Sequence, residues 1–299
     1  MKKIIDHIVL TYLESLSYKA LSDVAKRDYK LCIDRALTTK IDDKLIRAFS
    51  VRTFDTPKAQ IAYNIWAERG IPFANHIQAV MSKVFNHARQ IGMAEHNPFT
   101  LVVKLKHRAR KEVQSKESIY KFIETAYSEF KWRNVGVIVH MAYTWGQRLG
   151  DMRTLKFKDY DLSNRVLTLE QSKRRAKVYL PTTDELHKIL INQRDDMGFQ
   201  DYVAPRISYG KILSEPYSKA GLNNVARLIR KAAGLPDTFW IMDMRRTATT
   251  EMVDAGVPLP QIMSVTGHAN AQSLAPYMKN TLTSATEALN KRRQENGSM

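Results

Sequence analysis

The spacing of apolar residues constrains this chain more than any other feature, because it is helical over most of the first hundred positions. One stripe recurs at three- and four-residue intervals and consists of Ile4, Ile5, Ile8, Val9, Tyr12, Leu13 and Leu16. A second stripe runs from Ile77 to Ala88, between Pro72 and Gly92, which are typical start and stop signals. The segment AQIAYNIWAERG also closes on a glycine. Residues 1–103 are therefore predicted to form a small all-helical bundle.

The segment that follows, residues 104–115, has no apolar periodicity and is rich in basic side chains. Four of them are Lys104, Lys106, Arg108 and Arg110. This pattern predicts a basic linker between two domains, with side chains that contact DNA phosphates. A solvated charged linker without a ligand is the alternative.

From residue 116 onwards the pattern becomes mixed. The helical segments ESIYKFIETAYSEF and RNVGVIVHMAYTWG precede two strand-like runs, VLTLE and KVYLP, joined by the charged turn QSKRRA. Thr182 and Glu185 have capping-box spacing and predict that a helix starts directly after the second run. We expect residues 116–299 to form a mainly helical domain with a small β-hairpin or sheet, hence an α+β fold, with a C-terminal tail.

Composition favours a polyanionic partner and a reducing compartment. Lysine and arginine number 47 against 30 acids, a formal charge of +17, and both halves carry a basic excess. Charge alone leaves a generically basic protein equally possible. The single cysteine, Cys32, excludes an intrachain disulfide and a thiolate-rich zinc site. Asp6, His7 and Glu14 interrupt the first apolar stripe, so neither a signal peptide nor a membrane span is expected, and the predicted location is cytoplasmic.

Three short segments contain side chains suited to phosphate chemistry. Arg148 lies between two glycines in GQRLGDM, Arg245 lies in WIMDMRRTATT, and SVTGHANAQSLAPYM contains His268 and Tyr277. Phosphoryl transfer to a tyrosine requires cations for the nonbridging oxygens, a proton donor for the leaving oxygen, and a phenol beside the phosphorus. Arginines, a lysine, a histidine and a tyrosine supply these groups, and no metal or other cofactor is demanded.

On these residues the chain resembles the tyrosine recombinases, the family of phage integrases and Xer-type site-specific recombinases. The family's R-x-G-[DE] motif matches at Arg148, with Asp151 as the supporting acid. The family lysine lies in the turn of a β-hairpin before a proline, which corresponds to Lys173 in QSKRRAKVYLP. Arg174 and Arg175, like Lys177, crowd the same turn and are alternatives for that position.

The remaining motifs match with one departure. In the H-x-L-R-H-T box the second catalytic arginine corresponds to Arg245, but Met242 occupies the position of the first histidine. A thioether cannot move a proton at neutral pH, so that histidine's role must be absent, weakened or transferred. Thr266-Gly267-His268 matches the L-G-H box, and Tyr277 falls at the nucleophile's offset of nine residues, 277 minus 268.

The resemblance implies a C-shaped clamp around double-stranded DNA, with residues 1–103 as a core-binding domain and residues 116–299 as the catalytic domain. It further implies a 3′-phosphotyrosyl intermediate, a Holliday junction and a homotetramer on DNA, with an accessory or directionality protein as a possible partner. Arg148, Lys173, Arg245, His268 and Tyr277 are the expected catalytic residues. The expected DNA contacts are Lys104, Lys106, Arg108, Arg110, Arg174 and Arg175.

A phage or mobile-element integrase is the first expectation for the biological role. An Xer-type resolvase shares the motifs and the chain length. A type IB topoisomerase shares the chemistry but relaxes supercoils as a monomer. A catalytically impaired DNA-binding relative is the third alternative, which Met242 favours.

Overall fold

The computed structural model describes residues 4–107, 110–173 and 175–278, together with residues 286, 289, 290, 292 and 293. The chain divides into two compact units, residues 1–110 and 111–299. The boundary lies within the basic segment 104–115, whose described residues form neither helix nor strand. Arg108, Arg174 and most of the tail after Met278 lie outside the described residues.

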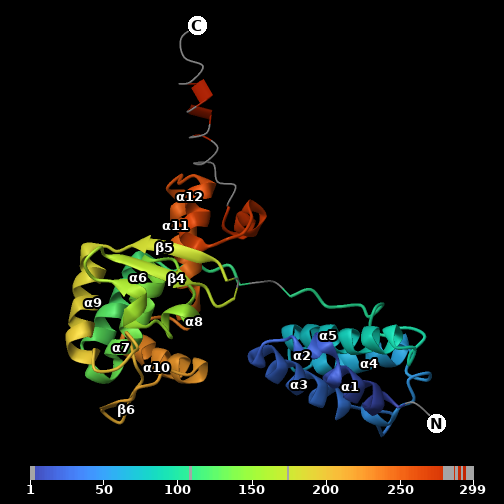
Figure 1. Ribbon diagram of the computed structural model, residues 1–299. Helices are drawn as coiled ribbons and strands as arrows, with labels where there is room; N and C mark the ends of the chain where they lie inside the picture. Colours follow the sequence, from blue (N-terminus) through green and yellow to red (C-terminus); the bar gives the residue numbers. More distant parts are fainter. Residues whose placement is uncertain are drawn as a thin grey trace. The chain divides into compact units, whose positions relative to one another are not determined.

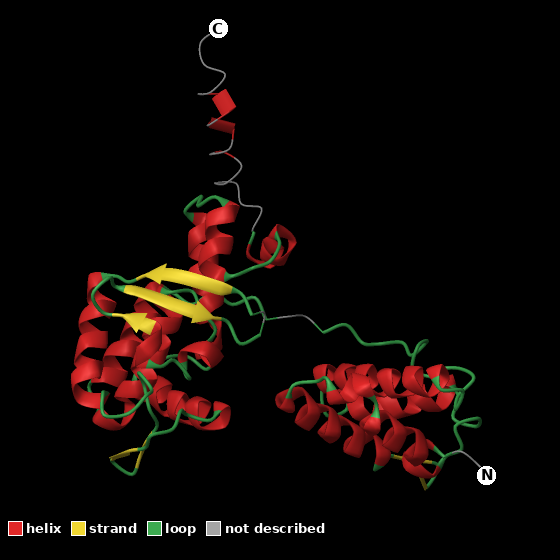
Figure 2. Cartoon of the chain, in the orientation of Figure 1, coloured by secondary structure: helices red, strands yellow, loops and turns green. Residues whose placement is uncertain are grey.

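The first unit is almost entirely helical (Figure 2). Its elements are α1 (Ile5–Glu14), α2 (Leu16–Lys19), α3 (Asp23–Leu37), β1 (Lys40–Ile41), β2 (Lys44–Leu45), η1 (Ile46–Ala48), α4 (Thr56–Ala67) and α5 (Ile71–Gln90). Helix α1 buries Ile5, Ile8, Val9 and Tyr12 of the predicted stripe, whereas Ile4 and Leu16 lie outside this helix and are exposed. Ser22 and Asp55 cap α3 and α4 by accepting backbone N–H bonds. The core contains an aromatic cluster of Phe54, Trp66, Phe85 and Phe99.

Side chains fasten both ends of the segment that joins the units. In the first unit, Gln60 accepts the Val103 N–H (2.8 Å), and a tyrosine hydroxyl of α4 accepts the Leu105 N–H (2.8 Å). In the second unit, the Gln114 N–H donates to Thr247 Oγ1 (3.1 Å). These bonds satisfy backbone groups that no helix or strand would otherwise pair. The stretch between the two attachments is residues 106–113.

The second unit is helical around a small sheet (Figure 1). Its elements are α6 (Lys116–Tyr127), α7 (Phe130–Thr144), α8 (Leu149–Met152), η2 (Phe157–Asp159), β3 (Tyr160–Asp161), β4 (Val166–Glu170), β5 (Lys177–Pro181), α9 (Asp184–Met197), β6 (Ile207–Ser208), β7 (Lys211–Ile212), α10 (Lys219–Ala232), η3 (Ile241–Asp243), α11 (Met244–Asp254), α12 (Leu259–Thr266) and η4 (Ala271–Tyr277).

The sheet has the antiparallel order β3-β4-β5, and its two long strands are the predicted runs VLTLE and KVYLP. Leu167 pairs with Leu180 and Leu169 pairs with Val178, and all four side chains are buried on the same face. Apolar residues therefore alternate along β4 and β5 because one face of the sheet is buried against the helices.

One predicted boundary is wrong by a residue. The N-cap of α9 is Thr183, whose hydroxyl accepts the Leu186 N–H (3.4 Å), rather than Thr182. Strand β5 extends through Pro181, and the Thr182 N–H still donates across to the Arg165 carbonyl (3.0 Å). Because this bond holds residue 182 to the neighbouring chain, the helix starts one position later.

The predicted fold class, mainly helical with a small sheet in the second half, is confirmed. No helix in the described part of the chain is both long enough and apolar enough to cross a bilayer.

Candidate active site

Arg148 is placed by the turn that follows α7. Gly146 adopts a left-handed conformation (φ 60°) there, and Arg148 then occupies the N-cap position of α8. Its guanidinium Nη1 donates to Gln171 Oε1 (2.8 Å) and lies 3.9 Å from Asp151 Oδ2. The side chain is 23% exposed, so the group is held from behind while part of it faces solvent.

Asp151 connects this arginine to the β4–β5 hairpin. Its buried carboxylate accepts the Ser172 N–H through Oδ1 (3.1 Å), and Oδ2 is the atom near Arg148. A buried carboxylate requires such compensation for the loss of water. Asp151 therefore fixes the start of the hairpin turn relative to Arg148.

Lys173 follows Ser172 in that turn, and its side chain is exposed. Arg175 forms an ion pair with a glutamate of β4 (3.1 Å), and the ammonium of Lys177 lies 5.4 Å from a tyrosine ring centroid. Arg174 lies outside the described residues. Of the basic residues described here, Lys173 is the one next to the point where Asp151 anchors the turn.

Two fully buried glutamines link the parts of the site. Gln171 Nε2 donates to Gln147 Oε1 (2.7 Å) and to the Thr266 carbonyl (2.9 Å). Gln147 Nε2 donates to the carbonyls of Trp145 (2.8 Å) and Val265 (2.7 Å). Each amide uses both its donor and acceptor ends, which fixes its orientation. The two side chains join the turn after α7, the hairpin and the end of α12.

Arg245 lies in the first turn of α11 and is only 9% exposed. Its Nη1 donates to the Gly146 carbonyl (3.2 Å) and lies 3.5 Å from Gln147 Oε1. Its Nη2 donates to the Thr266 carbonyl (2.5 Å) and lies 3.5 Å from His268 Nε2. The Thr266 carbonyl thus receives bonds from both Gln171 and Arg245, which brings the two arginine motifs into one network.

The hydrogen bonds of His268 define its tautomer. The Thr266 hydroxyl donates its single proton to the Ile262 carbonyl (2.6 Å), and its oxygen lies 2.7 Å from His268 Nδ1. Nδ1 must therefore be the donor in the second bond. In the neutral ring, Nε2 carries the lone pair on the side facing Arg245.

Gly267 permits the close approach of this turn to Gln171. It ends α12 in a left-handed conformation (φ 65°). A Cβ at this position would lie 2.7 Å from the amide oxygen and nitrogen of Gln171. Any side chain would push the hairpin and the histidine turn apart.

Tyr277 is the last residue of η4, a 3-10 helix that Asn270 caps by accepting the Ser273 N–H (3.0 Å). Its half-buried ring has its centroid 5.9 Å from that of His268, at an interplanar angle of 53°. The fully buried Leu274 anchors the same 3-10 helix. Arg148, Arg245, His268 and Tyr277 thus come together in one site.

Met242 is placed differently. Its side chain is 63% exposed and lines a shallow apolar hollow with residues of α10 and with Trp240. The described lining of that hollow includes none of Arg148, His268 and Tyr277. Of the predicted DNA contacts, Lys104, Lys106 and Arg175 are exposed and Arg110 is half-buried.

Sequence reasoning missed Gln147 and Gln171 and named Thr266 only as a motif position, although these three residues hold the network together. Each lies within two positions of a predicted site residue, at or shortly after the end of a helix or strand. This proximity is the local signal that could have indicated them. Among the described residues assigned to this site above, the charged groups are mostly basic, and the carboxylate of Asp151 accepts the Ser172 N–H. This set of groups suits an anionic ligand better than a metal ion.

Comparison with known proteins agrees with this geometry. Residues 110–283 match the model of the phage integrase family. The chain is 25% identical to the integrase of Enterobacteria phage 434 over 172 residues, 56% of this chain and 47% of the relative. It is 23% identical to tyrosine recombinase XerC of Corynebacterium glutamicum over 175 residues, 57% of this chain and 55% of the relative. The matched region thus spans about half the length of these relatives.

Two solved structures show the same fold. One is a lambda integrase dimer bound to a COC′ core site, with a TM-score of 0.74 at 20% identity, covering 91% of this chain and 76% of that one. The other is the Tn1549 transposon integrase in complex with a circular intermediate DNA, with a TM-score of 0.79 at 14% identity, covering 97% of this chain and 100% of that one. Because the family model covers more than half of the sequence, the chain belongs to the phage integrase family.

Proposed function

We propose that this protein is a site-specific DNA recombinase that cleaves and rejoins double-stranded DNA through Tyr277. The observation that carries the proposal is the single network that joins Arg148, Arg245 and His268 and places the Tyr277 ring beside that of His268. Guanidinium groups held from behind bind the nonbridging oxygens of a phosphodiester, and their charge stabilises the transition state.

The reaction uses a separate group for each proton. Tyr277 Oη forms a bond to phosphorus, and its proton passes to His268 Nε2; the resulting imidazolium keeps this proton and donates a hydrogen bond to a nonbridging phosphate oxygen. The bond from phosphorus to the 5′-oxygen breaks, and Lys173 supplies the proton to that leaving group. The product is a 3′-phosphotyrosyl link with a free 5′-hydroxyl. Since the link keeps the energy of the phosphodiester, rejoining needs neither ATP nor a metal ion.

Both units take part in the proposed DNA complex. Residues 1–103 bind the core site, residues 104–115 connect the units, and residues 116–299 contain the catalytic site, so that the chain closes around duplex DNA as a C-shaped clamp. The exposed cations Lys104, Lys106 and Arg175 contact phosphates. One solved structure with this fold is a lambda integrase tetramer bound to a Holliday junction, which supports a homotetramer here.

An integrase of a phage or other mobile element is the biological role we favour, with the cytoplasm or nucleoid of a bacterial host as its location. The matches to a phage integrase and to a transposon integrase support this role. The proposed role includes an accessory or directionality protein as a partner. The match to XerC leaves a resolvase as the second role.

A nicked suicide substrate tests the chemistry. Target DNA is taken from the sequences that flank the coding region, and covalent adducts are measured on denaturing gels. The wild-type protein should form an adduct, and Tyr277→Phe should form none, whereas Tyr209→Phe, at a fully exposed tyrosine, should match the wild type. An adduct that survives Tyr277→Phe contradicts the mechanism. Plasmid relaxation without exchange between sites would indicate a topoisomerase instead.

Met242→His tests whether the departure from the family motif limits the rate. Because the Met242 side chain is exposed and lines a hollow apart from His268, we expect the single-turnover cleavage rate to stay unchanged. Faster cleavage by Met242→His would show that a histidine at this position handles a proton in the reaction and that His268 does not take over this role in the wild type.

A further inference from the structure

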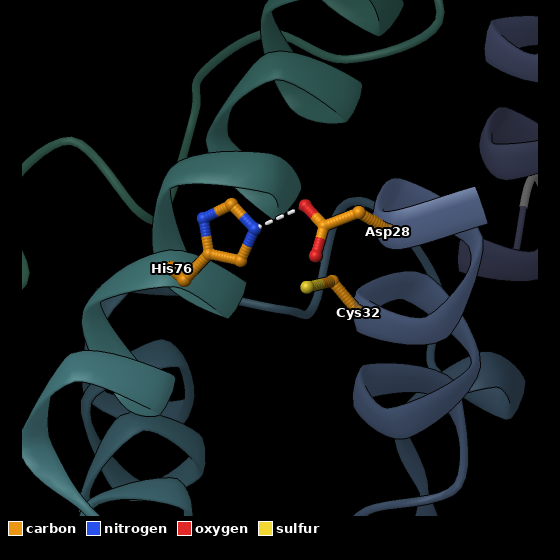
Figure 3. A group of neighbouring side chains, drawn as sticks. All are labelled: Asp28, Cys32 and His76. Carbon is orange, nitrogen blue, oxygen red and sulfur yellow. Dashed lines mark hydrogen bonds and ion pairs between the residues drawn. The ribbon is translucent and has the colours of Figure 1, made fainter. Parts of the chain in front are cut away.

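Three side chains of the first unit form a cluster that recombination does not use (Figure 3). Asp28 and Cys32 lie one turn apart on the same face of α3, and His76 extends toward them from α5. His76 Nε2 lies 2.5 Å from Asp28 Oδ2. One nitrogen, one sulfur and one carboxylate oxygen all lie within 4.8 Å of one another. Their sequence separation conceals the cluster, since His76 is 44 positions beyond Cys32 (76 minus 32).

The burial of the three groups differs in a way that suits an ion entering from solvent. Cys32 is 4% exposed and forms the floor of the cluster. The side chains of Asp28 and His76 are 49% and 45% exposed and form its rim. Such a gradient provides both an entry path and room for a water molecule as a further ligand.

The chemistry of the donors fits zinc. Thiolate sulfur, imidazole nitrogen and carboxylate oxygen are the three ligand types that Zn²⁺ takes in proteins, and three protein ligands plus water complete a tetrahedral site. Small rotations about the side-chain bonds of the exposed Asp28 and His76 can bring their donors closer. Without an ion, burial and the nearby Asp28 carboxylate raise the pKa of the Cys32 thiol to about 11, so the sulfur is protonated at neutral pH.

Other polar groups around the cluster are already engaged. The Lys83 ammonium binds the Tyr29 hydroxyl, and it also lies 5.0 Å from the centroid of the Tyr29 ring. The Tyr29 ring in turn lies edge-on to His76, with centroids 6.5 Å apart. The position of the His76 imidazole is therefore restricted by aromatic packing as well as by Asp28.

We propose that Asp28, Cys32 and His76 bind one Zn²⁺ ion, with water as the fourth ligand. On binding, the Cys32 S–H bond breaks, a sulfur–zinc bond forms, and the proton passes to solvent. His76 Nε2 exchanges its bond to Asp28 for a bond to the ion. The bound ion cross-links α3 to α5 and stabilises the first unit. This function is independent of the chemistry at Tyr277.

Cobalt tests the proposal directly, because Co²⁺ replaces Zn²⁺ and a cobalt–thiolate bond gives a charge-transfer absorption band. The chain has a single cysteine, so such a band in the full-length protein reports on Cys32 alone. We expect one equivalent of Co²⁺ to produce the band and one equivalent of Zn²⁺ to remove it. No band in folded wild-type protein with Co²⁺ in excess overturns the proposal.

Variants separate this site from unspecific binding by the other histidines. Cys32→Ala should abolish the band, and His76→Ala and Asp28→Asn should each weaken Co²⁺ binding about tenfold or more. His96→Ala, at an exposed loop residue outside the cluster, should bind as the wild type does. Wild-type affinity in both His76→Ala and Asp28→Asn would show that the cysteine alone holds the ion and would overturn the proposed site.

Thermal unfolding gives a second measurement that needs no spectroscopic band. Zn²⁺ at about a hundredfold excess over its dissociation constant should raise the Tm of the first unit by about 5 °C or more. The same Zn²⁺ concentration should raise the Tm of His76→Ala by clearly less, at most about half as much, because binding about tenfold or more weaker lowers the stabilisation. His76→Ala retains the buried Cys32, so it tests the contribution of the imidazole. An equal rise in both proteins would contradict the assignment.

Discussion

The two units of this protein bury polar side chains for different purposes. In the first unit Gln78 donates to the Phe99 carbonyl (2.7 Å), and the Thr39 hydroxyl accepts the Trp66 Nε1–H (2.8 Å) and donates to the Arg35 carbonyl (2.8 Å), so these buried groups pair with the backbone or with neutral side chains. In the second unit the buried polar groups contact one another across four chain segments and include an arginine. Buried polar groups that serve the fold pair with neutral partners, whereas the network of the second unit also holds the partly exposed guanidinium of Arg148, and such a buried network that holds a charged group at the surface indicates a site.

The largest expected effect distinguishes a buried arginine of the network from a surface arginine. Arg245→Ala removes a charge from the phosphate site, and we expect single-turnover cleavage to fall about 100- to 1000-fold. It also removes the bonds to the Gly146 carbonyl and to the Thr266 carbonyl, which then keeps only its donor Gln171, and this should lower the free energy of unfolding by about 1–3 kcal/mol. Suicide-substrate kinetics and chemical denaturation measure the two effects.

Arg47 is the matched control for the loss of stability. It pairs with Asp6 at 3.0 Å, and the two side chains are 47% and 34% exposed. Because water screens this pair, Arg47→Ala should change the free energy of unfolding by only about 0–1 kcal/mol. Equal losses of stability in Arg47→Ala and Arg245→Ala would remove the contrast between the units.

A second comparison exchanges one buried glutamine in each unit for leucine. Gln171→Leu removes three hydrogen bonds, those to the Arg148 guanidinium, to Gln147 Oε1 and to the Thr266 carbonyl, of which the last keeps its bond from Arg245. We therefore expect a loss of about 3 kcal/mol and a cleavage rate at least about tenfold lower. Gln78→Leu removes one bond, and about 1 kcal/mol should be lost. Denaturation of each variant and cleavage by Gln171→Leu are measured. A Gln171→Leu protein with wild-type cleavage would show that the network does not position the arginine.

The third comparison uses two glycines with the same backbone conformation. Gly267 and Gly92 have φ values of 65° and 68°, so alanine costs about 1 kcal/mol of strain at each. A Cβ at Gly92 meets nothing within 4 Å, whereas a Cβ at Gly267 meets the Gln171 amide at 2.7 Å. Overpacking should therefore make Gly267→Ala about 1–2 kcal/mol less stable than Gly92→Ala. Equal thermal stabilities of the two variants would contradict this steric account.

Much of the fold follows from local sequence patterns. The middle of the predicted stripe, Ile5 to Tyr12, becomes the buried face of α1, whereas its ends Ile4 and Leu16 lie outside this helix and are exposed. VLTLE and KVYLP become β4 and β5 with the predicted bounds. The cap of α9 shifted to Thr183 because a cross-strand bond to Arg165 holds Thr182. Periodicity reports which face of a segment is buried, but it contains no information on bonds to a distant strand.

The sequence likewise indicated some residues of the candidate site and not others. Motif order indicated Arg148, Arg245, His268 and Tyr277, and the structure brings these residues together. No pattern indicated that Gln171 would meet Gln147 and the Thr266 carbonyl, because these groups are distant in sequence and approach only after the hairpin packs on α12. The cluster of Cys32 with His76 was missed for the same reason. Tertiary packing, rather than local spacing, creates contacts of this kind.

The smallest expected effect concerns the pH dependence of stability in the second unit. His140 is 1% exposed and its Nδ1 lies 3.1 Å from the Tyr127 hydroxyl, and burial lowers the pKa of this histidine although Glu185 opposes the shift. Below pH about 6.5 the unfolded chain therefore binds a proton that the folded chain does not, and stability falls by up to about 1.4 kcal/mol per pH unit until the folded pKa is reached. His140→Gln should flatten this slope in denaturation experiments between pH 5 and 7, about the range of histidine titration. His96→Gln, at an exposed loop residue of the first unit, should keep it; a slope lost equally in both variants would assign the pH dependence elsewhere.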